Sequence, residues 1–383
     1  MTENYSAYFD NAATTFPKPE RVYSFMDQFY RTNGVNIGRS NSSSGKSAFR
    51  LQKETRELLL ELFHCPGKQV IFEPSATVAL NQVIRGIEWS EGDTVYITPF
   101  EHNAVLRPLN YLKDKYNLKI LELYVDKDTI SYNLEKIKYQ FQEQPPRVII
   151  VSHASNVCGV IAPIEKIFSL AKKYCSITIA DMSQTAGLID TDLIKAQADF
   201  AIFAGHKTLY GPFGIAGFIS TQEIPLKPLI YGGTGIESAN PYMPDQLPIK
   251  YEAGSQNILS IAGLNASLKW IFETGIDEIL KKDEENKLKL LKTLKEFDFL
   301  HIINPLVNTV GIISSTIKGY SSESLADFFL ENNISVRLGL HCSPKAHSFL
   351  GTFPSGTIRF SVGFFNTDED FMNLKNTLMT VYE

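Results

Sequence analysis

Two polar residues that end apolar runs indicate where chemistry could occur in this chain. Lys207 follows FAGH at residues 203–206 and precedes a turn rich in Gly and Pro, and Asp181 follows the run ITIA. A buried acid is costly without a cationic partner. A lysine amine and an acid together suit pyridoxal phosphate, since the amine joins the aldehyde and the acid keeps the ring nitrogen protonated. Taken alone, Asp181 could equally cap a helix and Lys207 could be a solvated surface residue.

Other polar residues could complete such a site. Ser75, Ala76 and Thr77 lie between an apolar run and a helical pattern. Backbone N–H groups at that position bind phosphate, although Ser75 could also simply cap the helix. His102 could stack on the pyridine ring, and Asn156 could hydrogen-bond the ring's phenolic oxygen. A single histidine is more often structural.

The order of the predicted elements brings these residues together. Short strands are expected at 70–72, 94–98, 118–124, 147–153, 176–180, 199–204 and 214–220. Helical patterns lie between several of them, which is typical of an α/β protein whose mostly parallel sheet is covered on both faces. The polar turns PSAT, PFEHN, SHASN, ADMSQ and AGHK each follow a strand. Ligands bind at the carboxyl ends of such strands, so these turns predict one site.

The pattern changes after about residue 258. A long charged helical stretch is expected at 261–296, followed by a strand at 309–314, a helix at 322–332, strands at 335–338 and 357–362, and a helix from Thr367. We therefore predict a large domain over residues 15–258. A smaller α+β domain is predicted over residues 259–383, with residues 1–14 associated.

Composition limits the remaining function classes. The chain has 383 residues, 44% of them hydrophobic, and a formal net charge of −5, which gives no reason to expect nucleic acid or an anionic membrane surface as a partner. No signal-like segment or apolar run of about 18 residues is present, so no membrane span is expected. The four cysteines form no CxxC pair. We expect a reduced, cytoplasmic protein without a metal site.

The sequence resembles the class V pyridoxal-phosphate enzymes of fold type I, in the group of cysteine desulfurases and selenocysteine lyases. The resemblance runs from YFDNAATTFPKP at 8–19 to FFNT at 364–367, with EHNAV, SN, ADMSQ, GHK and EAGS in the family's order. It implies a large domain with a mostly parallel seven-stranded sheet, a smaller C-terminal α+β domain, and a homodimer with shared sites.

The resemblance also implies roles for single residues. In it, Lys207 bonds to the cofactor aldehyde and removes the substrate's α proton, and Arg359 binds the substrate carboxylate through its planar fork. Asn36 and Arg39 would line the entrance. The residues implied to contact the cofactor are Asp181 at the ring nitrogen, Gln184 and Asn156 at the phenolic oxygen, His102 on the ring face, Thr77 and His206 at the phosphate, and Ser255 at the phosphate of the other subunit. Ala204 stands where the family often has a hydroxyl, so one phosphate contact is expected to be lost.

Cys342, in VRLGLHCSPKAH at 336–347, aligns with the family's persulfide-forming cysteine. A free thiol with a pKa of about 8.5 is only slightly ionised at neutral pH, so Arg337 or His341 could favour the thiolate. Free cysteines are usually small buried residues, but a polar loop favours a reactive thiol. The implied reaction converts L-cysteine to L-alanine and passes the sulfur, as a persulfide on Cys342, to an acceptor protein or thiol.

Three alternatives remain open. Selenocysteine lyase or another class V reaction would use the same cofactor. A non-catalytic sulfur-transfer scaffold could keep the fold, although the combination of Lys207, Asp181, His102 and Arg359 argues against it. The segment SNSSSGKS at 40–47 resembles a nucleotide-binding loop, but Ser40 stands at the position of the required glycine and no apolar strand precedes it.

Overall fold

The computed structural model describes residues 7–37, 42–222, 224–303 and 308–381. Its largest sheet has seven strands in the order β2-β10-β9-β8-β7-β3-β4. Only β10 runs antiparallel to its neighbours. These strands are β2 (Gln69–Glu73), β3 (Thr94–Ile97), β4 (Lys119–Glu122), β7 (Val148–Ser152), β8 (Ile177–Asp181), β9 (Phe200–Ala204) and β10 (Ala216–Ser220). The predicted mostly parallel seven-stranded sheet is confirmed.

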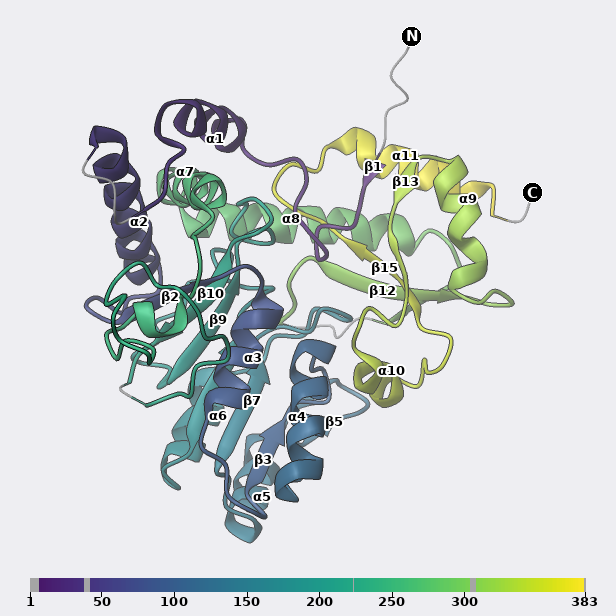
Figure 1. Cartoon of the computed structure of the whole chain (residues 1–383). Helices are drawn as coiled ribbons and strands as arrows, with labels where there is room; N and C mark the ends of the chain where they lie inside the picture. The colour runs from purple at the N-terminus through teal and green to yellow at the C-terminus, as the bar shows by residue number, and fades with distance from the viewer. Residues whose placement is uncertain (1–6, 38–41, 223, 304–307, 382–383) are drawn as a thin grey trace.

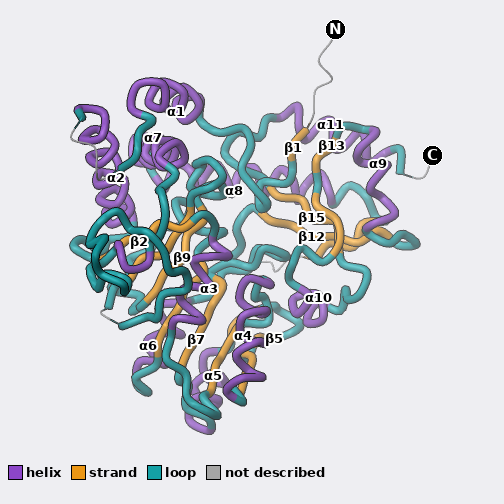
Figure 2. The backbone as a smooth tube through the Cα atoms, in the orientation of Figure 1, coloured by secondary structure: helices purple, strands orange, loops and turns teal. Residues whose placement is uncertain are grey.

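Helices cover both faces of this sheet (Figures 1 and 2). Successive side chains of a strand point to opposite faces, and in β7 both sets are buried. Val148 and Ile150 join a core with α3 (Ala76–Gly86) and α4 (Asn103–Tyr116). Ile149 and Val151 join a core with α2 (Ser43–Leu62), α6 (Ile164–Lys172) and α7 (Ile258–Thr274). Burial on both faces explains why these strands are continuous apolar runs rather than alternating ones.

The prediction of one continuous helix over residues 261–296 was wrong. Two helices occupy this region, α7 and α8 (Ile276–Leu294), and Gly275 separates them with a φ of 86°. A positive φ suits glycine because it has no Cβ, so this residue turns the chain without strain. α7 packs against α1 (Glu20–Asn33) and α2.

A second, antiparallel sheet lies in the C-terminal part of the chain, in the order β11-β12-β15-β14. Its strands are β11 (Leu300–Ile303), β12 (Ile312–Ile317), β14 (Arg337–Gly339) and β15 (Thr357–Ser361). The N-terminal β1 (Ala7–Tyr8) pairs with β13 (Ile334–Ser335), and Asp10 bridges to Ser361. The N-terminal residues therefore lie against this smaller part, whereas a domain boundary near residue 258 stays a prediction.

The remaining elements lie between these strands along the chain or follow the last of them. They are the hairpin β5 (Val125–Asp126) and β6 (Ser131–Tyr132), α5 (Leu134–Glu143), α9 (Ala326–Glu331), α10 (Pro344–Leu350) and α11 (Asp368–Met379), with 3-10 turns at Ile249–Tyr251 and Glu323–Leu325. Strand β11 and helix α10 were not anticipated from the sequence. No helix in the described ranges is both long and apolar enough to span a membrane.

Candidate active site

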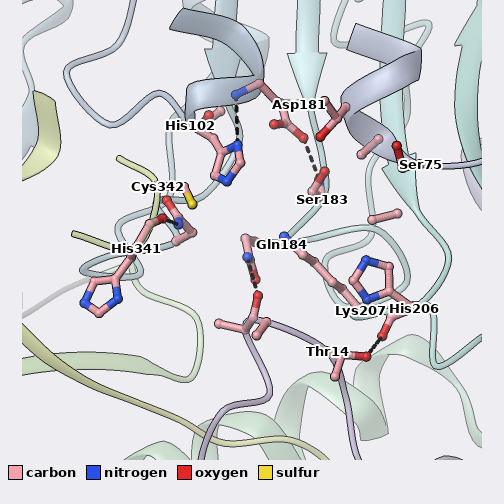
Figure 3. A pocket seen from close by; sticks show the side chains of 18 of the residues that line it. Thr14, Ser75, His102, Asp181, Ser183, Gln184, His206, Lys207, His341 and Cys342 are labelled. Carbon is pink, nitrogen blue, oxygen red and sulfur yellow. Dashed lines mark hydrogen bonds between the residues drawn. The ribbon is translucent and has the colours of Figure 1, made fainter. Parts of the chain in front are cut away.

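One cavity of about 480 Å³ is lined by residues at the carboxyl ends of the strands of the large sheet and by residues of the C-terminal part of the chain. All five polar turns identified in the sequence contribute to it, through Ser75, His102, Asn156, Asp181 and Lys207 among others. From the C-terminal part, Arg359 and Cys342 also line it. Figure 3 shows Lys207 and His206 on one side of the cavity, and Cys342 and His102 on the other.

The turn between β9 and β10 positions Lys207. A Cβ on Gly205 would lie 2.5 Å from the carbonyl oxygen of Ile215, so only glycine permits this close approach. The N–H of Tyr210 donates to the carbonyl of Lys207 at 2.8 Å, which closes the turn. Within the described part of the chain, no hydrogen bond or ion pair engages the Lys207 Nζ. Burial lowers the pKa of Lys207 from 10.5 to about 8, although the negative charge of Asp181 raises this pKa. With a pKa of about 8, the amine is still mostly protonated near pH 7, but far more of it is neutral and nucleophilic than in an ordinary lysine.

Asp181 ends β8 and is buried. Its Oδ1 accepts a hydrogen bond of 3.0 Å from the N–H of Ser183, so the carboxylate closes a local turn. No helix begins at Asp181, which removes the helix-cap alternative. Nearby, Nε2 of Gln184 donates to the carbonyl of Ala12 at 2.9 Å and ties this turn to the N-terminal segment.

His102 lies at the N-terminus of α4, where its Nδ1 accepts from the N–H of Ala104 at 3.0 Å. The ring therefore carries its proton on Nε2. Burial, with the charge of Lys207 as the next cause, lowers the pKa of His102 to about 4, which keeps the ring neutral at physiological pH. Glu101 fixes the preceding turn, since its carboxylate accepts from Thr98 Oγ1 at 2.7 Å and from the N–H of Ser152 at 2.8 Å.

The start of α3 and the ring of His206 form the end of the cavity suited to a phosphate. Ser75 Oγ accepts from the N–H of Val78 at 3.3 Å, which leaves the N–H groups of Ala76 and Thr77 to a ligand, as at other helix starts. The His206 ring stacks on Phe213, with centroids 4.6 Å apart. Its Nδ1 is buried and finds no hydrogen-bond partner among the described residues. Burial lowers the pKa of His206 to about 3, so this ring is neutral.

These residues fit the cofactor expected from the sequence. An amine without a partner, a buried carboxylate, a helix start and an orphaned histidine nitrogen match the aldehyde, ring nitrogen and phosphate of pyridoxal phosphate. A buried polar atom without a partner is rare in proteins, and a bound ligand is one of its explanations.

Arg359 is 3% exposed and lies on β15. Its Nη2 donates to Asp10 Oδ1 at 2.7 Å, and its Nη1 donates to the carbonyl of Asn156 at 2.9 Å. Its Nε is buried without a partner in the described part of the chain. The guanidinium is thus held in one orientation, while N–H donors remain for a substrate carboxylate. This role of Asp10 was not predicted from the sequence.

The loop carrying Cys342 is strained and firmly held. His341 and Cys342 have φ values of 49° and 56°, in a region that costs most residues free energy. The N–H of Asn103 donates to the carbonyl of Cys342 at 2.7 Å. The Asn156 side chain binds both neighbours of Cys342: its Nδ2 donates to the carbonyl of His341 at 2.8 Å, and its Oδ1 accepts from Ser343 Oγ at 2.7 Å. These bonds present an exposed thiol at the cavity.

His341 does not supply the positive charge proposed for the thiol. Its ring is buried, and burial together with the charge of Arg359 lowers its pKa to about 2. Its Nε2 instead lies 2.9 Å from Thr357 Oγ1. Arg337 remains a candidate because its half-exposed guanidinium lines the cavity, 3.9 Å from Asp10.

Some predicted site residues lie elsewhere. Asn36 and Ser255 are exposed and are not among the residues that line the cavity. Arg39 lies outside the described residues. Ser40 also lies outside them, whereas Gly45 and Lys46 of the same segment fall inside α2, which is not a phosphate-binding loop.

Three residues that hold the site together were not predicted from the sequence: Asp10, Ser183 and Ser343. Ser183 lies inside the quoted turn ADMSQ, and its position two residues after an acid is typical of a local turn. The partners of Asp10 and Ser343 are far away in sequence, and no local pattern indicates them.

Comparisons with known proteins agree on one family. The model of the aminotransferase class-V family matches residues 7–374. A probable cysteine desulfurase of Pyrococcus abyssi is 30% identical over 374 residues, covering 95% of this chain and 91% of that protein. A probable cysteine desulfurase of Methanothermobacter thermautotrophicus is 28% identical over 382 residues, covering 97% and 93%. The apo structure of a cysteine desulfurase from Thermococcus onnurineus superposes with a TM-score of 0.90 at 27% identity, covering 97% of this chain and 94% of that one.

Proposed function

The chain belongs to the aminotransferase class-V family, and we propose that it is a pyridoxal-phosphate-dependent cysteine desulfurase that releases L-alanine and keeps the sulfur on Cys342. The observation that carries this proposal is one cavity shared by Lys207, Asp181, Arg359 and an exposed thiol. A transaminase needs the first three of these residues but has no use for the thiol.

Pyridoxal phosphate, when bound, supplies an aldehyde for amines and a cationic ring that withdraws electrons from the substrate's α carbon. Lys207 would hold the aldehyde and Asp181 the ring nitrogen. The N–H groups of Ala76 and Thr77, with Nδ1 of His206, would hold the phosphate. His102 and Gln184 line the same cavity and would contact the ring.

Arg359 and Lys207 act on the amino acid. The guanidinium of Arg359 binds the substrate carboxylate through donors that Asp10 and Asn156 leave unused, and this fixes the α carbon in the cavity. The Lys207 amine removes the α proton. A pKa of about 8 suits this task, since a general base works best when its pKa lies near the working pH.

Cys342 receives the sulfur. Its thiolate attacks the sulfur of the substrate, a sulfur–sulfur bond forms, and the bond between that sulfur and the β carbon breaks. The electron pair of the broken bond stays with the β carbon, which takes up a proton, so cysteine becomes alanine. No external oxidant is required, because the two electrons that the substrate sulfur gives up remain on the β carbon and reduce it to a methyl group. Cys342 and Lys207 line the same cavity, so the thiol and the amine can act on one substrate.

We also infer that the enzyme is a cytoplasmic homodimer in which Ser255 serves the phosphate of the partner's site. Ser255 is exposed and near a segment with unusually exposed apolar side chains, including Tyr231 at 71% and Tyr242 at 81% exposure. Large exposed aromatic side chains favour association with another chain. A reducing compartment would keep the Cys342 thiol available. A single-chain mass in solution would contradict the dimer.

Purified protein loaded with pyridoxal phosphate and given L-cysteine tests the main proposal. We expect alanine to form, together with sulfide when a reductant is present. Serine, which lacks the sulfur, should give no alanine. Absence of alanine from cysteine would reject the activity, and formation of a keto acid without sulfur release would indicate a transaminase.

A further inference from the structure

A second cavity of about 460 Å³ adjoins the active site. It shares Thr77, His102, Ala104 and Cys342 with the first cavity, so the reactive thiol faces both. The rest of its lining consists of Asn81, Arg85, Asn103, Arg107, Pro108 and Tyr111. We call it the α3–α4 groove.

Two helical stripes form this groove. Thr77, Asn81 and Arg85 recur every four residues along α3, and Asn103, Arg107 and Tyr111 recur every four residues along α4. Residues at this spacing share one face of a helix. The two helices pack together, as Figure 1 shows, so their polar faces form the walls of one channel.

The groove is positively charged. Its lining contains two arginines and no carboxylate. Neither Arg85 nor Arg107 forms an ion pair with a carboxylate in the described ranges, and Arg85 instead lies over the ring of Tyr111 at 5.3 Å. Since the whole chain carries a net charge of −5, this groove is a local exception. Unpaired cations beside a cavity attract anionic ligands.

The length of the groove indicates the kind of ligand. The backbone of Cys342 is hydrogen-bonded to Asn103, at the start of α4. Arg107 lies one turn further along, at about 6 Å, and Tyr111 with Arg85 lies two turns along, at about 12 Å. A small thiol is too short to reach from Cys342 to Arg85. An extended peptide advances about 3.3 Å per residue, so two to four residues span these distances.

We propose that the α3–α4 groove receives a cysteine-bearing acidic segment of a sulfur-acceptor protein. Its cysteine lies against Cys342, and acidic side chains about two to four residues away lie against Arg107 and Arg85. The amino-acid substrate meanwhile uses the other cavity. This inference rests on the proposed desulfurase function, because it needs the persulfide on Cys342.

The transfer step is balanced without another reactant. The acceptor thiolate attacks the terminal sulfur of the Cys342 persulfide, and a new sulfur–sulfur bond forms. The original sulfur–sulfur bond breaks, and its electron pair leaves with Cys342 as a thiolate. The transferred sulfur keeps its proton, so the acceptor becomes a persulfide and the net charge is unchanged.

The test uses the holoenzyme, L-cysteine and three synthetic peptides that each contain one cysteine. The peptides carry Glu, Gln or Lys at the positions two and four residues from the cysteine. Mass spectrometry follows the persulfidated peptide, and alanine is measured in the same samples. At low salt, we expect the acidic peptide to react about fivefold faster than the neutral one and the basic peptide to react most slowly, with smaller differences at high salt.

Variants of the two groove arginines test whether the groove causes the preference for the acidic peptide. Replacing both arginines by Gln (R85Q with R107Q) should remove the preference, while the first turnover of alanine stays unchanged. The charge-keeping pair R85K with R107K should retain most of it. Arg50→Gln, which removes an exposed arginine from α2, should behave as the wild type.

The outcomes separate the two proposals. Absence of alanine would overturn the desulfurase function itself. Two results would overturn the proposed role of the α3–α4 groove. One is alanine formation with equal reaction rates for the three peptides, and the other is a preference for the acidic peptide that persists in the double Gln variant. An equal arginine-dependent preference for mercaptosuccinate, a small thiol with two carboxylates, would overturn the assignment to a peptide.

Discussion

The two sides of the active-site cavity are held in place by different kinds of contact. On the side of the large sheet, local contacts fix the side chains of Asp181 and His102: Asp181 accepts from the N–H of Ser183, and His102 accepts from the N–H of Ala104, both two residues away. Gln184, which donates to the carbonyl of Ala12, makes a long-range contact on this side. On the C-terminal side, contacts are long-range: Asn156 binds the carbonyl of His341, 185 residues away, and Arg359 binds Asp10, 349 residues away.

This difference separates two tasks. The side of the large sheet carries the residues expected to hold pyridoxal phosphate, and turns at the ends of rigid strands position them. The C-terminal side carries Arg359, which is expected to bind the substrate carboxylate, and the thiol of Cys342. The positions of both depend on hydrogen bonds between segments that are distant in sequence. Damage to the first side should therefore remove cofactor chemistry, whereas damage to the second should leave the cofactor bound and impair sulfur transfer.

Lys207→Ala tests the first side and should have the largest effect. Alanine formation should fall by about 10⁴-fold or more, because the variant lacks both the amine that holds the aldehyde and the base. After borohydride reduction, mass spectrometry of the wild type should find the cofactor on Lys207. Lys18 is the internal control, since burial lowers its pKa to about 8 as well, but its Nζ already donates to the carbonyl of Thr15 at 2.9 Å. A tag on Lys18 would contradict the assignment.

Cys342→Ser tests the second side. Sulfur transfer from L-cysteine should fall by at least about 10³-fold, because the variant has no thiolate to attack the substrate sulfur. The visible absorbance of the bound cofactor should stay, unlike in the Lys207 variant. Cys175→Ser removes the other exposed thiol and should change neither property. An equal loss of sulfur transfer in the Cys342 and Cys175 variants would contradict the assignment of the reactive thiol to Cys342.

Arg359→Lys should raise KM for L-cysteine by about ten- to a hundredfold, with a smaller change in kcat. The lysine keeps a positive charge for Asp10 but loses the planar fork that binds a carboxylate through two hydrogen bonds. Arg337→Lys is the matched control, because Arg337 is half-exposed and 3.9 Å from the same carboxylate. If the Arg337 variant raises KM as much, Arg359 is not the main clamp.

Asn156→Ala sharpens the comparison, because Asn156 follows a strand of the large sheet but binds the Cys342 loop. Loss of two buried hydrogen bonds should loosen the loop, slow sulfur transfer by about tenfold and speed alkylation of Cys342 in the cofactor-free protein. Ser343→Ala removes only one of these bonds and should have a smaller effect. Unchanged alkylation with a shifted cofactor absorbance would instead support the predicted contact of Asn156 with the phenolic oxygen.

The pH dependence of cofactor capture should show the smallest effect. Burial lowers the pKa of Lys207 to about 8, and only the neutral amine attacks an aldehyde. The rate at which cofactor-free protein captures pyridoxal phosphate should therefore rise with pH and level off above about 8. Asp181→Asn should move this midpoint to lower pH, because the charge of Asp181 raises the pKa of Lys207. A rate that keeps rising to pH 10 would indicate an ordinary lysine.

The same comparison explains how much the sequence could predict. Strand periodicity and polar turns located the large sheet and the residues at its rim, because these signals lie within a few residues of one another. The break at Gly275 was missed because helical periodicity continues on both sides of it. Cys342 and Arg359 came only from the family resemblance. The contacts that hold them, through Asp10 and Asn156, join distant segments and depend on tertiary packing.

A single turnover with L-cysteine tests the central claim most directly. Holoenzyme is mixed with one equivalent of L-cysteine and quenched, and then alanine and the peptide that contains Cys342 are quantified by mass spectrometry. We predict that alanine and a Cys342 peptide heavier by one sulfur atom form in equal amounts. Alanine formation without added sulfur on Cys342, or added sulfur on Cys175 instead, would contradict the account.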